Sequence, residues 1–149
     1  IEDALVDYFG YDFEGISTEE QLMVPIDGTK YNFKGYIDAV IKTSDGKYHV
    51  IDWKSCSWGW NMKRRTDPMT TYQLTLYKRY FSLKHNIEAD KIETYFGLLK
   101  RTAKNSRVEI FRVSSGTKKT YNAHILLMKA IKNRLSCSRC EFNKTEYCP

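Results

Sequence analysis

Apolar residues recur at helical spacing in three stretches of the chain. The first stretch ends at Gly10, and its apolar positions are Ile1, Ala4, Leu5, Tyr8 and Phe9. The second is expected to begin at Asp67-Pro68, a typical N-cap and first turn, and to end at Asn86. Its predicted buried stripe is Met69, Tyr72, Gln73, Leu76, Tyr77, Tyr80 and Leu83. The third helix is predicted from about Lys118 to Leu135, with apolar Ile125, Leu127, Met128, Ile131 and Leu135.

Five shorter apolar segments, each bounded by turn residues, predict β-strands. They cover residues 21–26, 31–41, 48–54, 92–99 and 107–113. The segment 55–66 is polar and contains tryptophan, so we expect a loop that is mobile without a ligand. The order of helix, three strands, helix, two strands and helix predicts an α/β (α+β) fold, with a central mixed β-sheet of about five strands flanked by helices.

The composition fits one folded domain. Hydrophobic residues make up 42% and aromatic residues 14% of the 149 residues, and no apolar run is long enough to span a membrane. No secretory signal is visible, and Ile rather than Met at position 1 leads us to expect a processed or excised segment. We assign residues 1–136 to one domain and residues 137–149 to a cysteine-containing tail packed on it.

Charge is unevenly distributed along the chain. Residues 1–30 carry eight acids and one base, whereas the remainder carries 23 bases and ten acids, which leaves a net charge of +6. A basic body suits a polyanionic partner such as DNA, although any single pair of bases is more typical of a solvated face. The candidate phosphate contacts are Lys63, Arg64, Arg65, Lys78, Arg79, Lys100, Arg101 and Lys104.

Two aspartates and a lysine lie in the second and third predicted strands. Asp52 and Lys54 are two positions apart, so both side chains leave the same face of a strand. A three-residue loop 44–46, with Gly46 left-handed, would place Asp38 opposite Asp52. A two-residue turn would instead place Asp38 opposite Trp53 and separate the acids. We expect the three-residue loop, and therefore a cluster of Asp38, Asp52 and Lys54.

This cluster suits phosphodiester hydrolysis with a divalent metal. Carboxylates can hold Mg²⁺ or Mn²⁺, and an ammonium group can place the attacking water or stabilise charge. The alternative is a surface hairpin whose polar face happens to carry these residues. The neighbouring Ile37, Val40, Val50 and Ile51 favour burial on both faces, where unpaired charges are rare.

The order Gly35-x-x-Asp38, then Asp52-x-Lys54, resembles the RecB-type branch of the PD-(D/E)XK nuclease superfamily, which includes phage-like exonucleases. The resemblance extends over most of the chain and implies a restriction-endonuclease-like core. It implies that Asp38, Asp52 and the backbone carbonyl of Trp53 are metal ligands. It also implies that Lys54 positions or deprotonates water, or stabilises charge on the scissile phosphate.

The motif Gln73-x-x-x-Tyr77 continues the same resemblance. These two residues lie one helical turn apart on one face. The resemblance implies that they hydrogen-bond the DNA backbone or orient Lys54. A glutamine at the edge of the core and a packed tyrosine are the alternative.

Many members of that family carry a further acid or histidine from the leading helix. Here no histidine precedes His49, and the candidates are Glu2, Glu14 and Glu20. We expect Glu20 to be the additional metal ligand, because it begins the strand that leads into the Asp38 hairpin. An acidic turn or a solvated loop at Glu19-Glu20 is the alternative.

Three of the four cysteines lie near the C-terminus. Cys137-x-x-Cys140 followed by Cys148 has the spacing of a metal site. Some RecB-type nucleases hold an iron–sulfur cluster in a similar tail, so we expect such a cluster or Zn²⁺, with reduced thiols and a disulfide as alternatives. Cys56 follows Lys54 by two positions, and we expect it to pack beside the active site.

The predicted loop 55–66 contains Trp58 and Trp60 ahead of Lys63-Arg64-Arg65. These residues are expected either to stack on and clamp a frayed DNA strand or to form an ordered loop that caps the core.

The leading hypothesis is a Mg²⁺- or Mn²⁺-dependent DNA exonuclease of recombination, repair or phage DNA processing. We expect it in the cytoplasm of a bacterial or phage-infected host, with DNA as its partner. A single-strand-binding or recombination protein and a further copy of the chain are the additional partners considered. The alternatives are a structure-specific or restriction-like endonuclease and a non-catalytic DNA-binding module with a metal at the cysteine tail.

Overall fold

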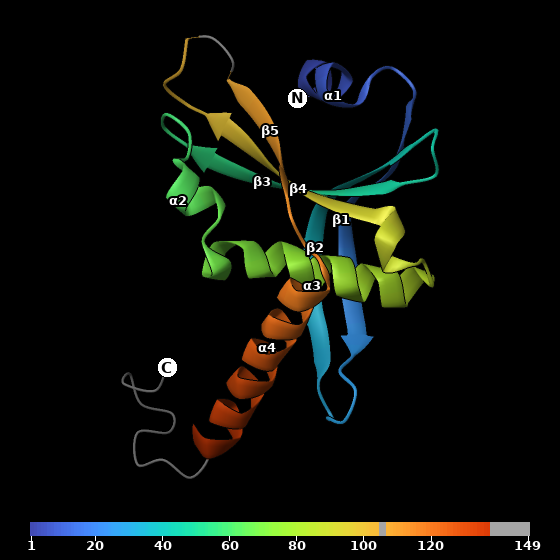
Figure 1. The fold of residues 1–149 in the computed structure, drawn as a ribbon, viewed down its shortest axis with the longest axis vertical. Helices are drawn as coiled ribbons and strands as arrows, with labels where there is room; N and C mark the ends of the chain where they lie inside the picture. Colours follow the sequence, from blue (N-terminus) through green and yellow to red (C-terminus); the bar gives the residue numbers. More distant parts are fainter. Residues whose placement is uncertain (105–106, 138–149) are drawn as a thin grey trace.

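A five-stranded mixed sheet forms the centre of the molecule in the computed structural model, which describes residues 1–104 and 107–137 (Figure 1). The strands are β1 (Phe13–Pro25), β2 (Asn32–Thr43), β3 (Tyr48–Cys56), β4 (Ile92–Lys100) and β5 (Val108–Val113). They are arranged in the order β1-β2-β3-β4-β5; β3 and β4 are parallel, and the other neighbours are antiparallel. The predicted mixed sheet flanked by helices is confirmed.

The two faces of the sheet carry different helices. The helices are α1 (Glu2–Phe9), α2 (Met62–Arg65), α3 (Pro68–His85) and α4 (Thr117–Cys137), with a short 3-10 turn η1 (Ala89–Lys91). Residues of α3 and α4 pack against the buried cluster that contains Val50, whereas residues of α1 pack against the cluster that contains Ile51. Within the described residues, none of the helices is both long and apolar enough to cross a membrane.

Helix α3 begins and ends where the sequence predicts. The Asp67 side chain accepts a hydrogen bond from the Thr70 backbone N–H, and Asn86 ends the helix in the left-handed conformation. The predicted buried stripe is partly wrong, because Met69, Gln73 and Leu83 are exposed. The buried positions are instead Thr71, Leu74, Thr75, Tyr77, Tyr80 and Phe81. Apolar residues surround most of this helix, so their period does not select one face, and the small threonines allow close approach to the sheet.

Two element boundaries differ from the prediction. Strand β1 begins at Phe13 rather than Gln21, and its pairing with β2 shifts between Gly15 and Ser17. The predicted loop 55–66 is in part ordered: β3 extends to Cys56, and α2 forms where the Asn61 side chain accepts a hydrogen bond from the Arg64 N–H. An alternating pattern is weak in the first half of β1, because most of its side chains face solvent.

The β2–β3 hairpin has the predicted three-residue loop. The Thr43 N–H donates to the Lys47 carbonyl, and Gly46 has a φ of 85°. The paired residues run from Lys42 and Tyr48 to Ala39 and Ile51, so the next opposed positions are Asp38 and Asp52.

At that point the two strands separate. Strand β2 continues along β1 to Asn32, whereas β3 continues along β4 to Cys56. In Figure 1 the β1–β2 pair runs downward, β3 and β4 run to the left, and α3 lies across the β1–β2 pair. We call this divergence at Asp38 and Asp52 the fork.

On the α1 side of the sheet, the Trp53 ring lies directly on the backbone of Gly97. A Cβ added to Gly97 would lie 2.1 Å from Trp53 Cε3, a distance that requires the ring to move. We expect Gly97→Ala to lower the free energy of unfolding by about 2 kcal/mol, the usual cost of overpacking. Denaturant unfolding measures the change.

Gly15→Ala is the matched control, because a Cβ there meets nothing within 4 Å. It should change the free energy of unfolding by less than about 0.5 kcal/mol. Equal unfolding midpoints for the two variants would show that the Trp53–Gly97 contact is not tight.

Candidate functional site

Asp38 occupies the fork and replaces a piece of the β-ladder. Its Oδ2 accepts a hydrogen bond of 2.8 Å from the Trp53 backbone N–H. The backbone pairing of β2 with β3 ends at Ala39 and Ile51, so this carboxylate satisfies the next N–H of β3 after the strands diverge. The hydrogen bond fixes the carboxylate of one strand against the backbone of the other.

Asp52 lies beside it and is almost completely buried, at 4% exposure. Lys54 Nζ lies 2.9 Å from Asp52 Oδ2, yet this oxygen accepts no well-formed hydrogen bond, so the contact is one of opposite charges. Burial raises the pKa of Asp52; the Lys54 ammonium opposes that increase, and the Asp38 carboxylate adds to it. The predicted cluster of Asp38, Asp52 and Lys54 is therefore present in space.

A continuous series of contacts joins Lys54 to α3. Lys54 Nζ donates to Gln73 Oε1 at 3.3 Å, and Gln73 Nε2 donates to the Tyr77 hydroxyl at 2.9 Å. The Tyr77 ring in turn lies against Gly35, where an added Cβ would be 2.7 Å from Tyr77 Cε1. This gives Gly35 a physical role that its place in the motif alone did not reveal. The geometry matches an orienting role of Gln73 toward Lys54.

The residues at the fork suit a hard divalent cation. Mg²⁺ is commonly held by one or two carboxylates together with substrate oxygens, and Asp52 offers a buried oxygen that lacks a hydrogen bond. Among the described side chains, those of residues 1–104 and 107–133, no group of three or more His, Cys, Asp or Glu is placed to hold a metal. The fork therefore supplies two carboxylates, and the Trp53 carbonyl remains a predicted third ligand.

Glu20 does not join this pair. Its carboxylate contacts Lys84 Nζ at 3.2 Å and the His85 ring, and it accepts a hydrogen bond from Ser17. The Glu20 backbone pairs with that of Ile37, the neighbour of Asp38, but the Glu20 carboxylate is held by the two cations at the C-terminal end of α3. The prediction of Glu20 as an additional ligand fails, because the cations at the C-terminal end of α3 draw its side chain away from the fork.

Three of the predicted DNA contacts are engaged within the protein. Glu109 pairs with both Arg65 and Lys100, the latter at 2.7 Å. Lys78 Nζ donates to the Ser115 carbonyl at 3.2 Å, and burial lowers its pKa. From the sequence, these side chains were expected to be available for DNA. Their partners are distant along the chain, and only the fold brings them together.

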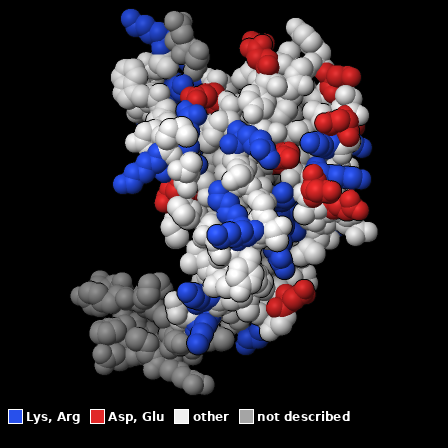
Figure 2. Space-filling model, viewed as in Figure 1, with Lys and Arg blue, Asp and Glu red and all other residues white. Residues whose placement is uncertain are grey.

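Other predicted contacts remain on the surface. Lys63, Arg64 and Arg101 are exposed, and Figure 2 shows Lys and Arg side chains down the middle of the face in view, with many acids gathered at one side. The two loop tryptophans differ: Trp58 is 75% exposed, whereas Trp60 is 7% exposed. Trp60 therefore caps the core and cannot stack on DNA in this conformation.

Cys56 is buried in the cluster on the α3 side of the sheet, and its packing beside the active site stays a prediction. Cys137 is the last residue of α4. Cys140 and Cys148 lie outside the described residues, so the predicted iron–sulfur or zinc site in the tail stays a prediction.

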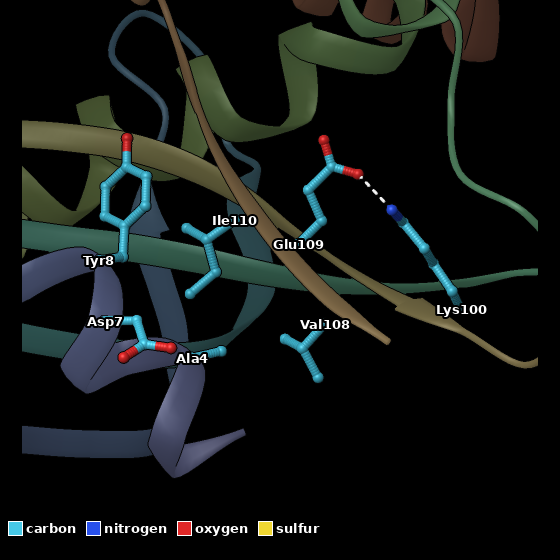
Figure 3. A pocket seen from close by; sticks show the side chains of 7 residues that line it. All are labelled: Ala4, Asp7, Tyr8, Lys100, Val108, Glu109 and Ile110. Carbon is cyan, nitrogen blue, oxygen red and sulfur yellow. Dashed lines mark ion pairs between the residues drawn. The ribbon is translucent and has the colours of Figure 1, made fainter. Parts of the chain in front are cut away.

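A cavity of about 540 Å³ lies between α1 and β5 (Figure 3). It is lined by Ala4, Asp7, Tyr8, Lys100, Val108, Glu109 and Ile110. None of the fork residues lines it, so this cavity is separate from the candidate active site.

Comparisons with known proteins agree with the geometry. The family model described as the PD-(D/E)XK nuclease superfamily matches residues 3–149. No curated protein sequence matches the chain. A solved structure described as "Crystal structure of SSO0001" aligns with a TM-score of 0.56 and 20% sequence identity, over 99% of this chain. The present chain spans 65% of that solved chain, and at this identity the likeness shows a shared fold alone.

The raised pKa of Asp52 predicts a distinctive effect of pH on stability. Because the pKa of Asp52 in the folded protein lies above 3.8, the folded protein keeps the Asp52 proton to a higher pH than the unfolded chain does. The free energy of unfolding therefore falls as pH rises from 3.8 through the raised pKa. Asp52→Asn removes that loss. In chelator, we expect the free energy of unfolding of the Asp52→Asn variant to exceed that of the parent, by a margin that grows as pH rises from 3.8 through the raised pKa of Asp52.

Asp45→Asn is a control of opposite sign. Hydrogen bonds from the Thr43 hydroxyl and the Lys47 N–H lower the pKa of Asp45, so its contribution is present above pH 3.8. The Asp45→Asn change should therefore destabilise the protein at neutral pH. If Asp52→Asn destabilises the protein as Asp45→Asn does, the electrostatic description of Asp52 is wrong.

Proposed function

The chain belongs to the PD-(D/E)XK nuclease superfamily, and we propose that it is a DNA nuclease that uses Mg²⁺ or Mn²⁺ and degrades DNA as an exonuclease. The observation that supports this function is the convergence of Asp38, Asp52 and Lys54 at the fork. A module that only binds DNA gains nothing from two acids facing phosphates, because like charges repel and burial of Asp52 destabilises its ionised form.

Asp38 and Asp52 would hold the divalent ion, with the Trp53 carbonyl as a third ligand. Such an ion polarises a phosphoryl oxygen and lowers the pKa of water. The Asp38 carboxylate is fixed by the Trp53 N–H, so it requires little reorganisation to bind a cation. Burial of Asp52 and repulsion from Asp38 both destabilise the ionised Asp52 carboxylate, so a bound cation would stabilise it.

Lys54 would supply positive charge beside the scissile phosphate. Asp52 and Gln73 hold its ammonium group from two sides, at 2.9 and 3.3 Å. A fixed cation is most effective where negative charge develops in the transition state, since no reorganisation is needed during the reaction. The same group could place the attacking water. Tyr77 would act on Lys54 indirectly, by orienting the Gln73 amide.

The exposed bases Lys63, Arg64 and Arg101 are the proposed contacts to the DNA backbone. A role in recombination, repair or phage DNA processing belongs to the same proposal, as do a cytoplasmic location, association with a single-strand-binding or recombination protein, and self-association. These parts rest on the family resemblance.

Substitutions at the fork provide the direct test. Asp52→Asn and Lys54→Ala should each lower the rate of metal-dependent DNA cleavage by at least about 100-fold, because the first weakens the proposed metal site and the second removes a cation beside the scissile phosphate. Labelled DNA with Mg²⁺, Mn²⁺ or chelator measures the rate, and retained DNA binding shows that the protein is folded. Lys34→Ala, an exposed change on the same hairpin, is the control. Cleavage at the parental rate by both fork variants would refute the assignment.

The mode of attack is a separate prediction. An exonuclease needs an end, so linear duplex DNA should be degraded while a covalently closed circle of the same sequence stays intact. Gel analysis of both substrates in Mg²⁺ measures this. Conversion of the circle to nicked or linear products would favour the endonuclease alternative and leave the metal site unaffected.

A further inference from the structure

The loop 57–66 lies on the same face of the sheet as the fork. The Trp60 ring packs against Phe96, with ring centroids 5.1 Å apart, and both belong to the buried cluster that contains Val50. Side chains two positions apart on a strand share a face, so Asp52 and Lys54 leave β3 on the side of Val50. Trp60 therefore lies on the same face of the sheet as Asp52 and Lys54.

One end of this loop is tied to the segment after β4. The Cys56 carbonyl accepts a hydrogen bond of 2.9 Å from the Arg101 N–H. The Ser57 carbonyl accepts from both the backbone N–H and the hydroxyl of Thr102, at 3.2 and 2.6 Å. These bonds fix the backbone immediately before Trp58.

The other end is tied through Glu109. Arg65 donates from Nε to the Trp60 carbonyl at 2.9 Å, and its guanidinium also pairs with Glu109. Lys100, the second partner of Glu109, places its side chain under Gly59, whose φ is 123°; an added Cβ there would be 3.3 Å from Lys100 Cε. Glu109 thus holds the backbone immediately after Trp58.

Between these two anchors the Trp58 side chain is 75% exposed. A single exposed apolar side chain is ordinary on a protein surface. Here, however, the backbone on both sides is fixed, and the second tryptophan of the same loop is buried. The Cα atoms of Lys54 and Trp58 are at most about 14 Å apart, because four residues of extended chain reach no farther. The indole is therefore held within a few nucleotides of the phosphate that Lys54 would contact.

We infer that Trp58 is a stacking platform for an unpaired base beside the scissile phosphate, so that the preferred substrate is DNA with a single-stranded end. Base faces inside a duplex are covered by their neighbours, whereas an unpaired base can stack on an aromatic ring without regard to sequence. Arg65, Lys100 and Glu109 act as positioning residues for the platform. This inference rests on the proposed nuclease function and names its substrate class.

The test compares linear duplexes of one sequence with blunt ends and with short 5′ or 3′ single-stranded extensions. The parent protein should cleave at least one extended substrate faster than the blunt one. Trp58→Ala should reduce that preference by roughly 5- to 150-fold, as expected for the loss of one base–aromatic stack. Trp58→Phe should keep most of it. Met62→Ala, an exposed apolar change in the same loop, should leave the preference unchanged.

A second measurement separates this inference from the nuclease proposal. Affinity for a labelled single-stranded oligonucleotide, without metal and in the Asp52→Asn protein, should fall on adding Trp58→Ala and recover with Trp58→Phe. If no substrate is cleaved but this pattern holds, the nuclease proposal fails and the platform stands. If cleavage occurs, and Trp58→Ala changes neither the end preference nor the affinity, the platform is refuted.

Discussion

The structure depends on the separation of β2 from β3 at Asp38 and Asp52. A sheet that forks leaves backbone groups unpaired at the branch, and buried unpaired groups are costly. Here the Asp38 carboxylate accepts a hydrogen bond from the Trp53 N–H, so a side chain pairs the backbone group that loses its partner where the strands separate. The same bond places one carboxylate next to the buried Asp52, with Lys54 as the nearby countercharge. Opening the sheet and assembling the charged site are thus one structural event.

Each face of the sheet holds this arrangement through a glycine. On the α1 side, Gly97 lets the Trp53 ring lie against the backbone of β4, which fixes the residue whose N–H binds Asp38. On the α3 side, Gly35 lets Tyr77 approach β2, and Tyr77 orients the amide that binds Lys54. The charged groups sit between two close contacts that larger residues would prevent. The rigidity of the site therefore comes from packing on both faces, and the ion pair alone does not explain it.

The sequence predicted those parts of the fold that local rules determine. Helix α3 follows from the Asp67-Pro68 start and the Asn86 end, and the opposition of Asp38 to Asp52 follows from the length of the loop 44–46. Interactions between distant segments were not predictable in the same way. Glu20 was expected at the metal because of its place in a strand, but its partners Lys84 and His85 lie more than sixty positions away. Likewise, nothing near Trp60 in the sequence distinguishes it from Trp58; its burial depends on the two phenylalanines of β4 and β5.

The same distinction applies to charge. A net charge of +6 suggests a broad cationic surface, yet the fold assigns some of those cations to internal tasks. Glu109 pairs with both Arg65 and Lys100, so it offsets one of their two positive charges, and these pairs shape the loop beside the fork. Contacts to the DNA backbone are then expected from exposed Lys and Arg side chains outside such pairs, such as Lys63 and Arg101. The ion pairs of Glu109 give this loop a fixed geometry. An exposed indole needs a fixed geometry to discriminate an unpaired base from a paired one. If the side chain were mobile, the entropic cost of ordering it would offset the free energy of stacking.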